Sequence, residues 1–152
     1  MTMQILERPA FTVAGMAIRT KPMSAEIPAL WPRFVARIGE IANPAEERVT
    51  YGVMRHEPPD ALYYLAAVAV DSAGNLPPGM DSLVVPAGTY ATFRYPLSDL
   101  GRGFGEIFNQ LLPSSGYMQI PGQPLFERYD EAFCPDEPAS LVEIGIPVKR
   151  AP

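Results

Sequence analysis

The sequence predicts an α+β fold made of two tandem β-α-β-β units with pseudo-two-fold symmetry, antiparallel sheets and two flanking helices. Two observations carry this prediction. Strand-like and helix-like patterns follow in the same order in both halves, and each half opens on a strand with an Ala-Gly step. Units that each expose one sheet face pack together, and small-molecule sites are common in clefts between such lobes. We expect one domain over residues 1–152, with lobes of about 1–75 and 80–152 and a ligand cleft between them.

The first half reads as strand, helix, strand, strand. Its first strand is apolar and is interrupted by Gly15, which indicates a bend. Apolar residues then recur at three- and four-residue spacing, which predicts a helix capped by Ser24, with Pro32 kinking it or marking its start. A hairpin follows, turning at Pro58-Pro59-Asp60. The predicted ranges are 11–19, 24–42, 49–57 and 62–70.

The second half repeats this order after a loop rich in glycine and proline at residues 71–81. Its first strand is broken at Pro86-Ala87-Gly88, and its helix carries apolar residues on one face. The halves share a pattern more than residue identities. The predicted ranges are 83–95 for the strand, 103–112 for the helix, and 117–120, 125–130 and 141–148 for the later strands.

Composition excludes several classes of function. Hydrophobic residues make up 47% and charged residues 19%, as in an ordinary globular domain. The net charge of −5 argues against a nucleic-acid partner and is compatible with cationic ligands. No apolar run or leader segment indicates a membrane, so we expect a cytoplasmic protein without membrane contact. The single Cys134 and single His56 leave too few ligands for zinc, and we expect no metal and no cofactor.

Glu127 is the residue with the most informative surroundings. Strand alternation places Leu125, Glu127 and Tyr129 on one face, and Phe126 and Arg128 on the other. A carboxylate among apolar neighbours is costly unless it is protonated, paired with an arginine or matched by a cationic ligand. Alternation alone does not distinguish these cases from an exposed strand glutamate.

Aromatic residues supply the second candidate feature. Six candidate tyrosines fall on predicted strands or at their ends, and Trp31 lies early in the first predicted helix. Aromatic walls offer flat apolar area and attract cations, although each residue taken singly could equally belong to the core. His56 has no acidic neighbour in sequence, so we expect it on the hairpin surface and not as a catalytic base. The six tyrosines are Tyr51, Tyr63, Tyr64, Tyr90, Tyr117 and Tyr129.

Several segments along the chain fit one known family. They are Phe11-Thr12-Val13-Ala14-Gly15 with Arg19-Thr20, Ile27-Pro28-Ala29-Leu30-Trp31, residues 85–93, residues 111–117, Pro124-Leu125-Phe126-Glu127-Arg128-Tyr129 and residues 142–148. Together these segments resemble the GyrI-like (AraC effector-binding) domain family of the multidrug-binding type. Their order and spacing cover nearly the whole chain and make the match specific. Because the resemblance starts by about residue 4, we expect a stand-alone member without a DNA-binding domain.

The resemblance implies that Glu127 is the pocket acid contacting lipophilic, cationic aromatic ligands. Trp31, Tyr51, Tyr64 and Tyr90 are implied as wall aromatics, and we include Tyr129 among the ligand-binding residues. The implied function is sensing or sequestration of such compounds. Two alternatives stay open: a hydrolase of reactive small molecules in which Glu127 acts as general acid or base, and a modulator of a protein partner of the gyrase-inhibitor type.

Overall fold

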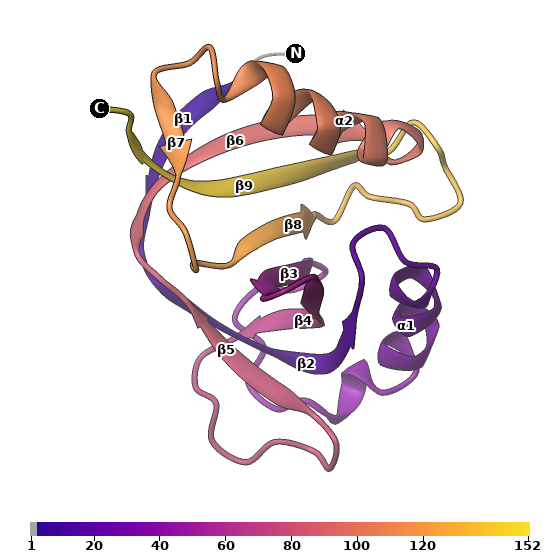
Figure 1. Cartoon of the computed structure of the whole chain (residues 1–152). Helices are drawn as coiled ribbons and strands as arrows, with labels where there is room; N and C mark the ends of the chain where they lie inside the picture. Colours follow the sequence, from indigo (N-terminus) through magenta and orange to yellow (C-terminus); the bar gives the residue numbers. More distant parts are fainter. Residues whose placement is uncertain (1–2) are drawn as a thin grey trace.

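A computed structural model describes residues 3–152 of the chain (Figure 1). Over this range the strands pair antiparallel throughout. The strands are β1 (Gln4–Arg8), β2 (Phe11–Thr20), β3 (Thr50–Glu57), β4 (Ala61–Val70), β5 (Asp81–Val85), β6 (Gly88–Pro96), β7 (Tyr117–Gln119), β8 (Leu125–Tyr129) and β9 (Leu141–Arg150). The helices are α1 (Glu26–Val35) and α2 (Leu100–Glu106), with 3-10 turns η1 (Ile38–Glu40) and η2 (Leu97–Asp99) and a π-helical turn η3 (Ile107–Leu111).

The strands form one curved sheet in the order β1-β6-β9-β8-β3-β4-β2-β5, with β7 added on β9. Outward from the centre, one half reads β8-β9-β6-β1 and the other β3-β4-β2-β5. In each half, the two strands nearest the centre are the last two strands of one β-α-β-β unit, β3 and β4 or β8 and β9. The first strand of that unit, β2 or β6, lies next to them on the outer side. The predicted tandem α+β fold is therefore confirmed, with the two sheets joined at β8 and β3.

Each half of the sheet is completed by a strand from the other half of the chain. The N-terminal β1 pairs with β6, and β5 pairs with β2, so the connections β1–β2 and β5–β6 cross between the two halves (Figure 1). No strand was expected at β1, because its short, partly exposed sequence lacks clear alternation. The repeat pattern therefore did not reveal which strands form the two edges of the sheet.

The two helices are shorter than their periodic patterns. Helix α1 contains Pro32 as an interior residue and ends at Val35, and η1 then carries the helical spacing onward so that Ile41 still reaches the core. The N-cap of α1 is Ala25 and not the predicted Ser24, although the Ser24 hydroxyl, one residue earlier, accepts a hydrogen bond from the Glu26 backbone N–H. Helix α2 starts at Leu100 and passes into the π-helical turn. Apolar periodicity therefore predicted which face of each helix is buried more accurately than it predicted where each helix begins and ends.

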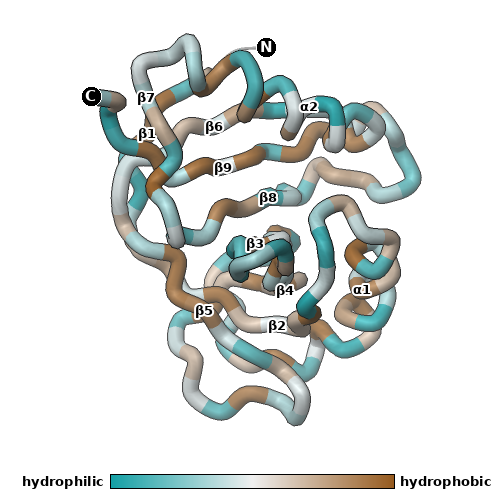
Figure 2. The backbone as a smooth tube through the Cα atoms, viewed as in Figure 1, coloured by the Kyte–Doolittle hydropathy of each residue, from teal (hydrophilic) through white to brown (hydrophobic). Residues whose placement is uncertain are grey.

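The two faces of the sheet bury different side chains. Helix α1 packs Leu30 and Phe34 on β2 and β4, while Ile107 packs near α2 on the β6–β9 side. The opposite face, inside the curl, holds an aromatic cluster that includes Tyr51 and Phe126. Figure 2 shows hydrophobic residues along β5, β8 and β9, and hydrophilic segments in the loop after β8. The helix-covered face is the one that contains the cavity described next.

Candidate functional site

Glu127 lies near the centre of the sheet on β8 and is 6% exposed. Its Oε1 accepts hydrogen bonds from the hydroxyls of Tyr64, at 2.9 Å, and Tyr129, at 2.7 Å. The Trp31 indole Nε1–H donates to the Tyr64 hydroxyl at 3.1 Å, so a chain of donors runs from α1 to the carboxylate. These residues come from α1, β4 and β8, and the register of the sheet brings them together.

The second carboxylate oxygen is left open. Within residues 3–152, Glu127 Oε2 has no hydrogen-bond partner, and no lysine, arginine or histidine nitrogen lies within 4.0 Å of the carboxylate. No fully buried side-chain oxygen in this part of the chain lacks a partner, so Oε2 must face accessible space. The site therefore holds one tethered oxygen and one that is free to accept.

Burial controls the electrostatics of this group. Removal from water raises the pKa of the Glu127 carboxyl, and the hydrogen bonds from Tyr129 and Tyr64 offset part of the rise. Burial, followed by the nearby Glu127 charge, raises the pKa of Tyr64 and of Tyr129 well above the usual phenol value. Both tyrosines thus stay neutral donors, and the carboxyl gains from any cation that enters.

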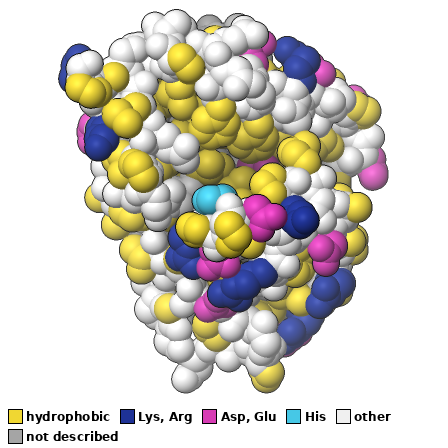
Figure 3. Space-filling model, in the orientation of Figure 1, with side chains coloured by type: hydrophobic (Ala, Val, Ile, Leu, Met, Phe, Trp, Pro, Cys, Tyr) yellow, Lys and Arg dark blue, Asp and Glu magenta, His cyan; other side chains and the backbone are white. Residues whose placement is uncertain are grey.

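A cavity of about 810 Å³ opens on this carboxylate between α1 and α2. Its lining is mostly apolar, and Figure 3 shows a hollow with hydrophobic side chains around it and the chain's histidine, His56, at its edge. Its volume suits a drug-sized ligand. The wall residues include Ile27, Pro28 and Trp31 from α1, Leu100 and Phe104 from α2, Phe108 from η3, and Met54, Leu62, Tyr64, Leu125, Glu127 and Tyr129 from the sheet.

Four of the six expected ligand-binding residues meet at this cavity: Glu127, Trp31, Tyr64 and Tyr129. The Trp31 and Tyr129 rings pack edge to face, with centroids 5.4 Å apart. Alternation along β8 is as predicted, with Leu125, Glu127 and Tyr129 on the cavity side. Whether these four residues bind a ligand stays a prediction.

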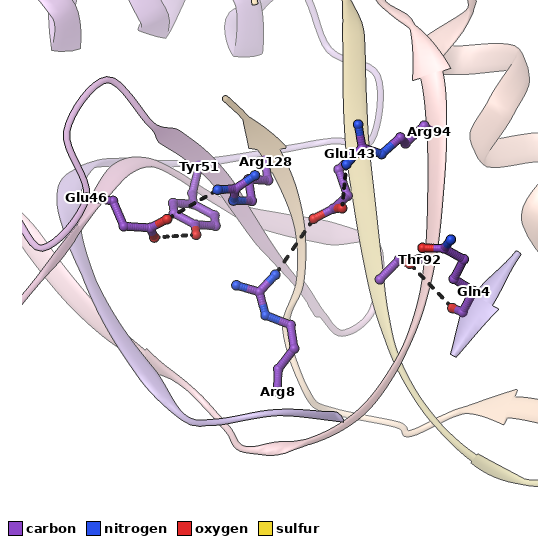
Figure 4. Close-up of polar contacts among 8 residues, drawn as sticks. All are labelled: Gln4, Arg8, Glu46, Tyr51, Thr92, Arg94, Arg128 and Glu143. Atoms are coloured by element: carbon purple, nitrogen blue, oxygen red, sulfur yellow. Dashed lines mark hydrogen bonds and ion pairs between the residues drawn. The ribbon is translucent and has the colours of Figure 1, made fainter. Parts of the chain in front are cut away.

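Tyr51 and Tyr90 do not line the cavity, which corrects the expected wall. Gly52 pairs with Glu127 across β3 and β8, so its neighbour Tyr51 must point to the other face. There the Tyr51 hydroxyl donates to Glu46 at 2.6 Å, beside Arg128 (Figure 4). Tyr90 also packs on that face, where its hydroxyl donates to the Pro86 carbonyl.

Sequence reasoning missed the wall that α2 supplies. Phe104 on α2 and Phe108 on the following turn η3 lie on the single apolar face predicted for the helix at residues 103–112, and their four-residue spacing gave no sign that this face borders a cavity. His56 lies on β3 as an exposed residue, as expected, but at the cavity edge. Among residues 3–152 no cluster of three or more histidine, cysteine, aspartate or glutamate side chains could hold a metal. In the same range, no helix combines the length and the apolar character that crossing a bilayer requires.

The curved antiparallel sheet and its apolar cavity define a small-molecule-binding domain of the α+β class. The family model described as a GyrI-like small molecule binding domain matches residues 1–149. The chain therefore belongs to the GyrI-like family, which confirms the resemblance seen in its sequence.

Curated and solved relatives agree with this assignment. The transcriptional regulator BrlR of Pseudomonas aeruginosa is 34% identical over 148 residues, which is 95% of this chain and 54% of BrlR. The chain thus spans about half the length of that curated relative. The structure of SAV2435 bound to tetraphenylphosphonium has a TM-score of 0.77 at 19% identity, covering 98% of this chain and 94% of SAV2435. The EcmrR C-terminal domain has a TM-score of 0.73 at 19% identity, covering 99% of this chain and 98% of that domain's chain. At these identities the two structures show a shared fold.

Proposed function

We propose that this chain binds lipophilic, cationic aromatic compounds in the cavity between α1 and α2, with Glu127 as the charge partner, for sensing or sequestration. The observation that carries the proposal is a buried carboxylate with one tethered oxygen and one open oxygen in an apolar cavity, with no cation of the described chain beside it. A buried charge without a partner is costly, and a cationic ligand removes that cost. The tetraphenylphosphonium bound to SAV2435 is a compound of this chemistry.

The three donors in the Glu127 network favour a cation over other ligands at the carboxylate. The Tyr64 and Tyr129 hydroxyls and the Trp31 indole N–H are already used within the network. An anion or a carbonyl compound would find no free donor at these three residues, whereas a cation meets an acceptor and aromatic faces. The selectivity that we propose is therefore for positive charge combined with aromatic bulk.

The test compares tetraphenylphosphonium with tetraphenylborate, which has similar shape and opposite charge. At an effective dielectric of about 20 and a separation of roughly 5.5 Å, the carboxylate contributes about 3 kcal/mol to cation binding. Glu127→Gln should therefore weaken tetraphenylphosphonium binding about 100-fold in calorimetric titration. The matched control is Glu143→Gln, which makes the same change in net charge outside the cavity. Glu143 lies on β9 opposite Arg128 in the strand register and forms ion pairs with Arg8 and Arg94.

Equal affinity of the native protein for both probes, or unchanged affinity in Glu127→Gln, would contradict the proposal. The open oxygen of Glu127 could also activate a water molecule, as a hydrolase requires. Mass spectrometry of reactive electrophiles incubated with the protein separates the two functions. Recovery of intact compound supports binding, and product that disappears in Glu127→Gln supports catalysis.

A further inference from the structure

The contact between Glu127 and Tyr64 crosses an intervening strand. Glu127 lies on β8 and Tyr64 on β4, and β3 runs between them. Neighbouring strands are about 4.8 Å apart, so the two side chains must span roughly twice that distance over the backbone of β3. They meet above Gly52, which pairs with Glu127 on one side and with Ala66 on the other.

Gly52 provides the space for this contact. A Cβ at position 52 would overlap the Tyr64 hydroxyl and would lie 2.6 Å from Glu127 Oε1 and 2.8 Å from Tyr64 Cζ. Cβ atoms in proteins essentially never approach other atoms so closely. The backbone of Gly52 is not in the positive-φ region, so strand geometry does not require glycine there. A glycine inside a buried strand weakens it and often marks a close approach by another group.

The other crowded strand glycines have different neighbours. A Cβ at Gly15 would meet the backbone of β4, and a Cβ at Gly145 would meet the Phe126 ring, so both positions serve the packing of the sheet. Gly52 faces the oxygens of the hydrogen-bonded pair itself. The lack of a side chain at Gly52 therefore makes room for the hydrogen bond of the site and does not serve only the packing of the core.

We propose that Gly52 is a positioning residue that lets Tyr64 hold Glu127 Oε1 and so keeps Oε2 directed into the cavity. A side chain at position 52 would separate the pair and turn the carboxylate away from the orientation in which Tyr64 holds it. The inference rests on the proposed binding of cations, because it assigns to Gly52 the preference for charged over neutral ligands. It predicts that a larger residue at position 52 weakens the binding of cationic ligands more than the binding of neutral, apolar ligands.

The experiment measures the affinity of tetraphenylphosphonium and of the neutral dye Nile red in the native protein and in Gly52→Ala. The control is Gly39→Ala, where a Cβ would meet nothing within 4 Å. We expect Gly52→Ala to weaken phosphonium binding about tenfold or more, as for a lost hydrogen bond to a charged group. Nile red binding should stay near the native value, and Gly39→Ala should match the native protein with both probes.

A second variant tests whether the clash is with the end of the Tyr64 side chain. Tyr64→Leu removes both the hydroxyl and the Cζ atom that the new methyl group would crowd, and it releases the Glu127 carboxylate to move aside. Adding Gly52→Ala to Tyr64→Leu should therefore cost less phosphonium affinity than adding it to the native protein. If Gly52→Ala alone does not fold, the double variant should regain near-UV circular dichroism. Additive effects, or a double variant that stays unfolded, would overturn the inference.

The two proposals fail in distinguishable ways. A native protein without preference for phosphonium over Nile red and tetraphenylborate contradicts the proposed function. A native preference that is lost in Glu127→Gln and kept in Gly52→Ala contradicts only the role of Gly52.

Discussion

The affinity of the cavity for a cation should depend on pH through a single carboxyl group. The titratable side chains that line the cavity are Glu127, Tyr64, Tyr129 and His56. Burial raises the pKa of Glu127, so in the free protein this carboxyl holds its proton to higher pH than an ordinary glutamate does. The raised pKa of both tyrosines keeps them neutral over the same range. A cation must therefore displace one proton, and only one, when the carboxyl is protonated.

This stoichiometry fixes the size of the effect. Below the pKa of Glu127 in the free protein, tetraphenylphosphonium affinity should fall about tenfold for each unit of decreasing pH, or about 1.4 kcal/mol. Above that pKa the carboxyl is already ionised and affinity should level off. A His56→Gln background removes the histidine at the cavity edge, so that the profile reports on Glu127.

Calorimetric titration in two buffers of different ionisation enthalpy measures the proton release directly. We expect nearly one proton per phosphonium ion in the acidic range and none on the plateau. Glu127→Gln should show no dependence on pH and no proton release. An affinity of the His56→Gln protein that stays constant from about pH 4 to about pH 8 would refute the assignment of Glu127 as a buried carboxyl that titrates on binding.

Three further changes test the structure. Because the folded protein raises the Glu127 pKa, native stability should decline as pH rises from the unfolded-state value of about 4.3 through the folded pKa. Urea unfolding should therefore show a larger gain in stability from Glu127→Gln at about pH 8 than at about pH 4. Phe126→Ala removes a fully buried ring from the aromatic cluster and should cost about 3–5 kcal/mol of unfolding free energy by urea titration. Tyr51→Phe loses the hydrogen bond to Glu46 and should cost about 0.5–1.5 kcal/mol, yet leave phosphonium affinity unchanged because Tyr51 lies outside the cavity.

The local patterns predicted most of the fold, because each unit has clear periodicity. Alternation in β8 placed Glu127 and Tyr129 on one face without knowledge of the partner strands. The same rule could not assign Tyr51 or Tyr90 to a face, since that requires the register with a distant strand. The spacing of residues within one strand does not determine its register with a strand far away in the sequence.

The cavity itself was harder to anticipate than the acid within it. Phe104 has the spacing of a core residue, and whether it meets another side chain or empty space depends on where α2 sits relative to α1. Gly52 likewise carries no local sign of its role, because its significance lies in side chains from β4 and β8. Contacts of this kind arise from tertiary placement, and the family resemblance conveyed the pocket as a whole where periodicity could not.

The exchange of β1 and β5 between the two halves sets an order on assembly as the chain leaves the ribosome. Gln4 pairs with Thr92, so the N-terminal strand has no partner until most of the chain has been made. Thr50 pairs with Tyr129, and this pairing completes the floor of the cavity later still. Such distant pairings close slowly. A nascent first half can form its hairpin and α1, but it can neither complete its own sheet nor bind ligand until the second half has been synthesised.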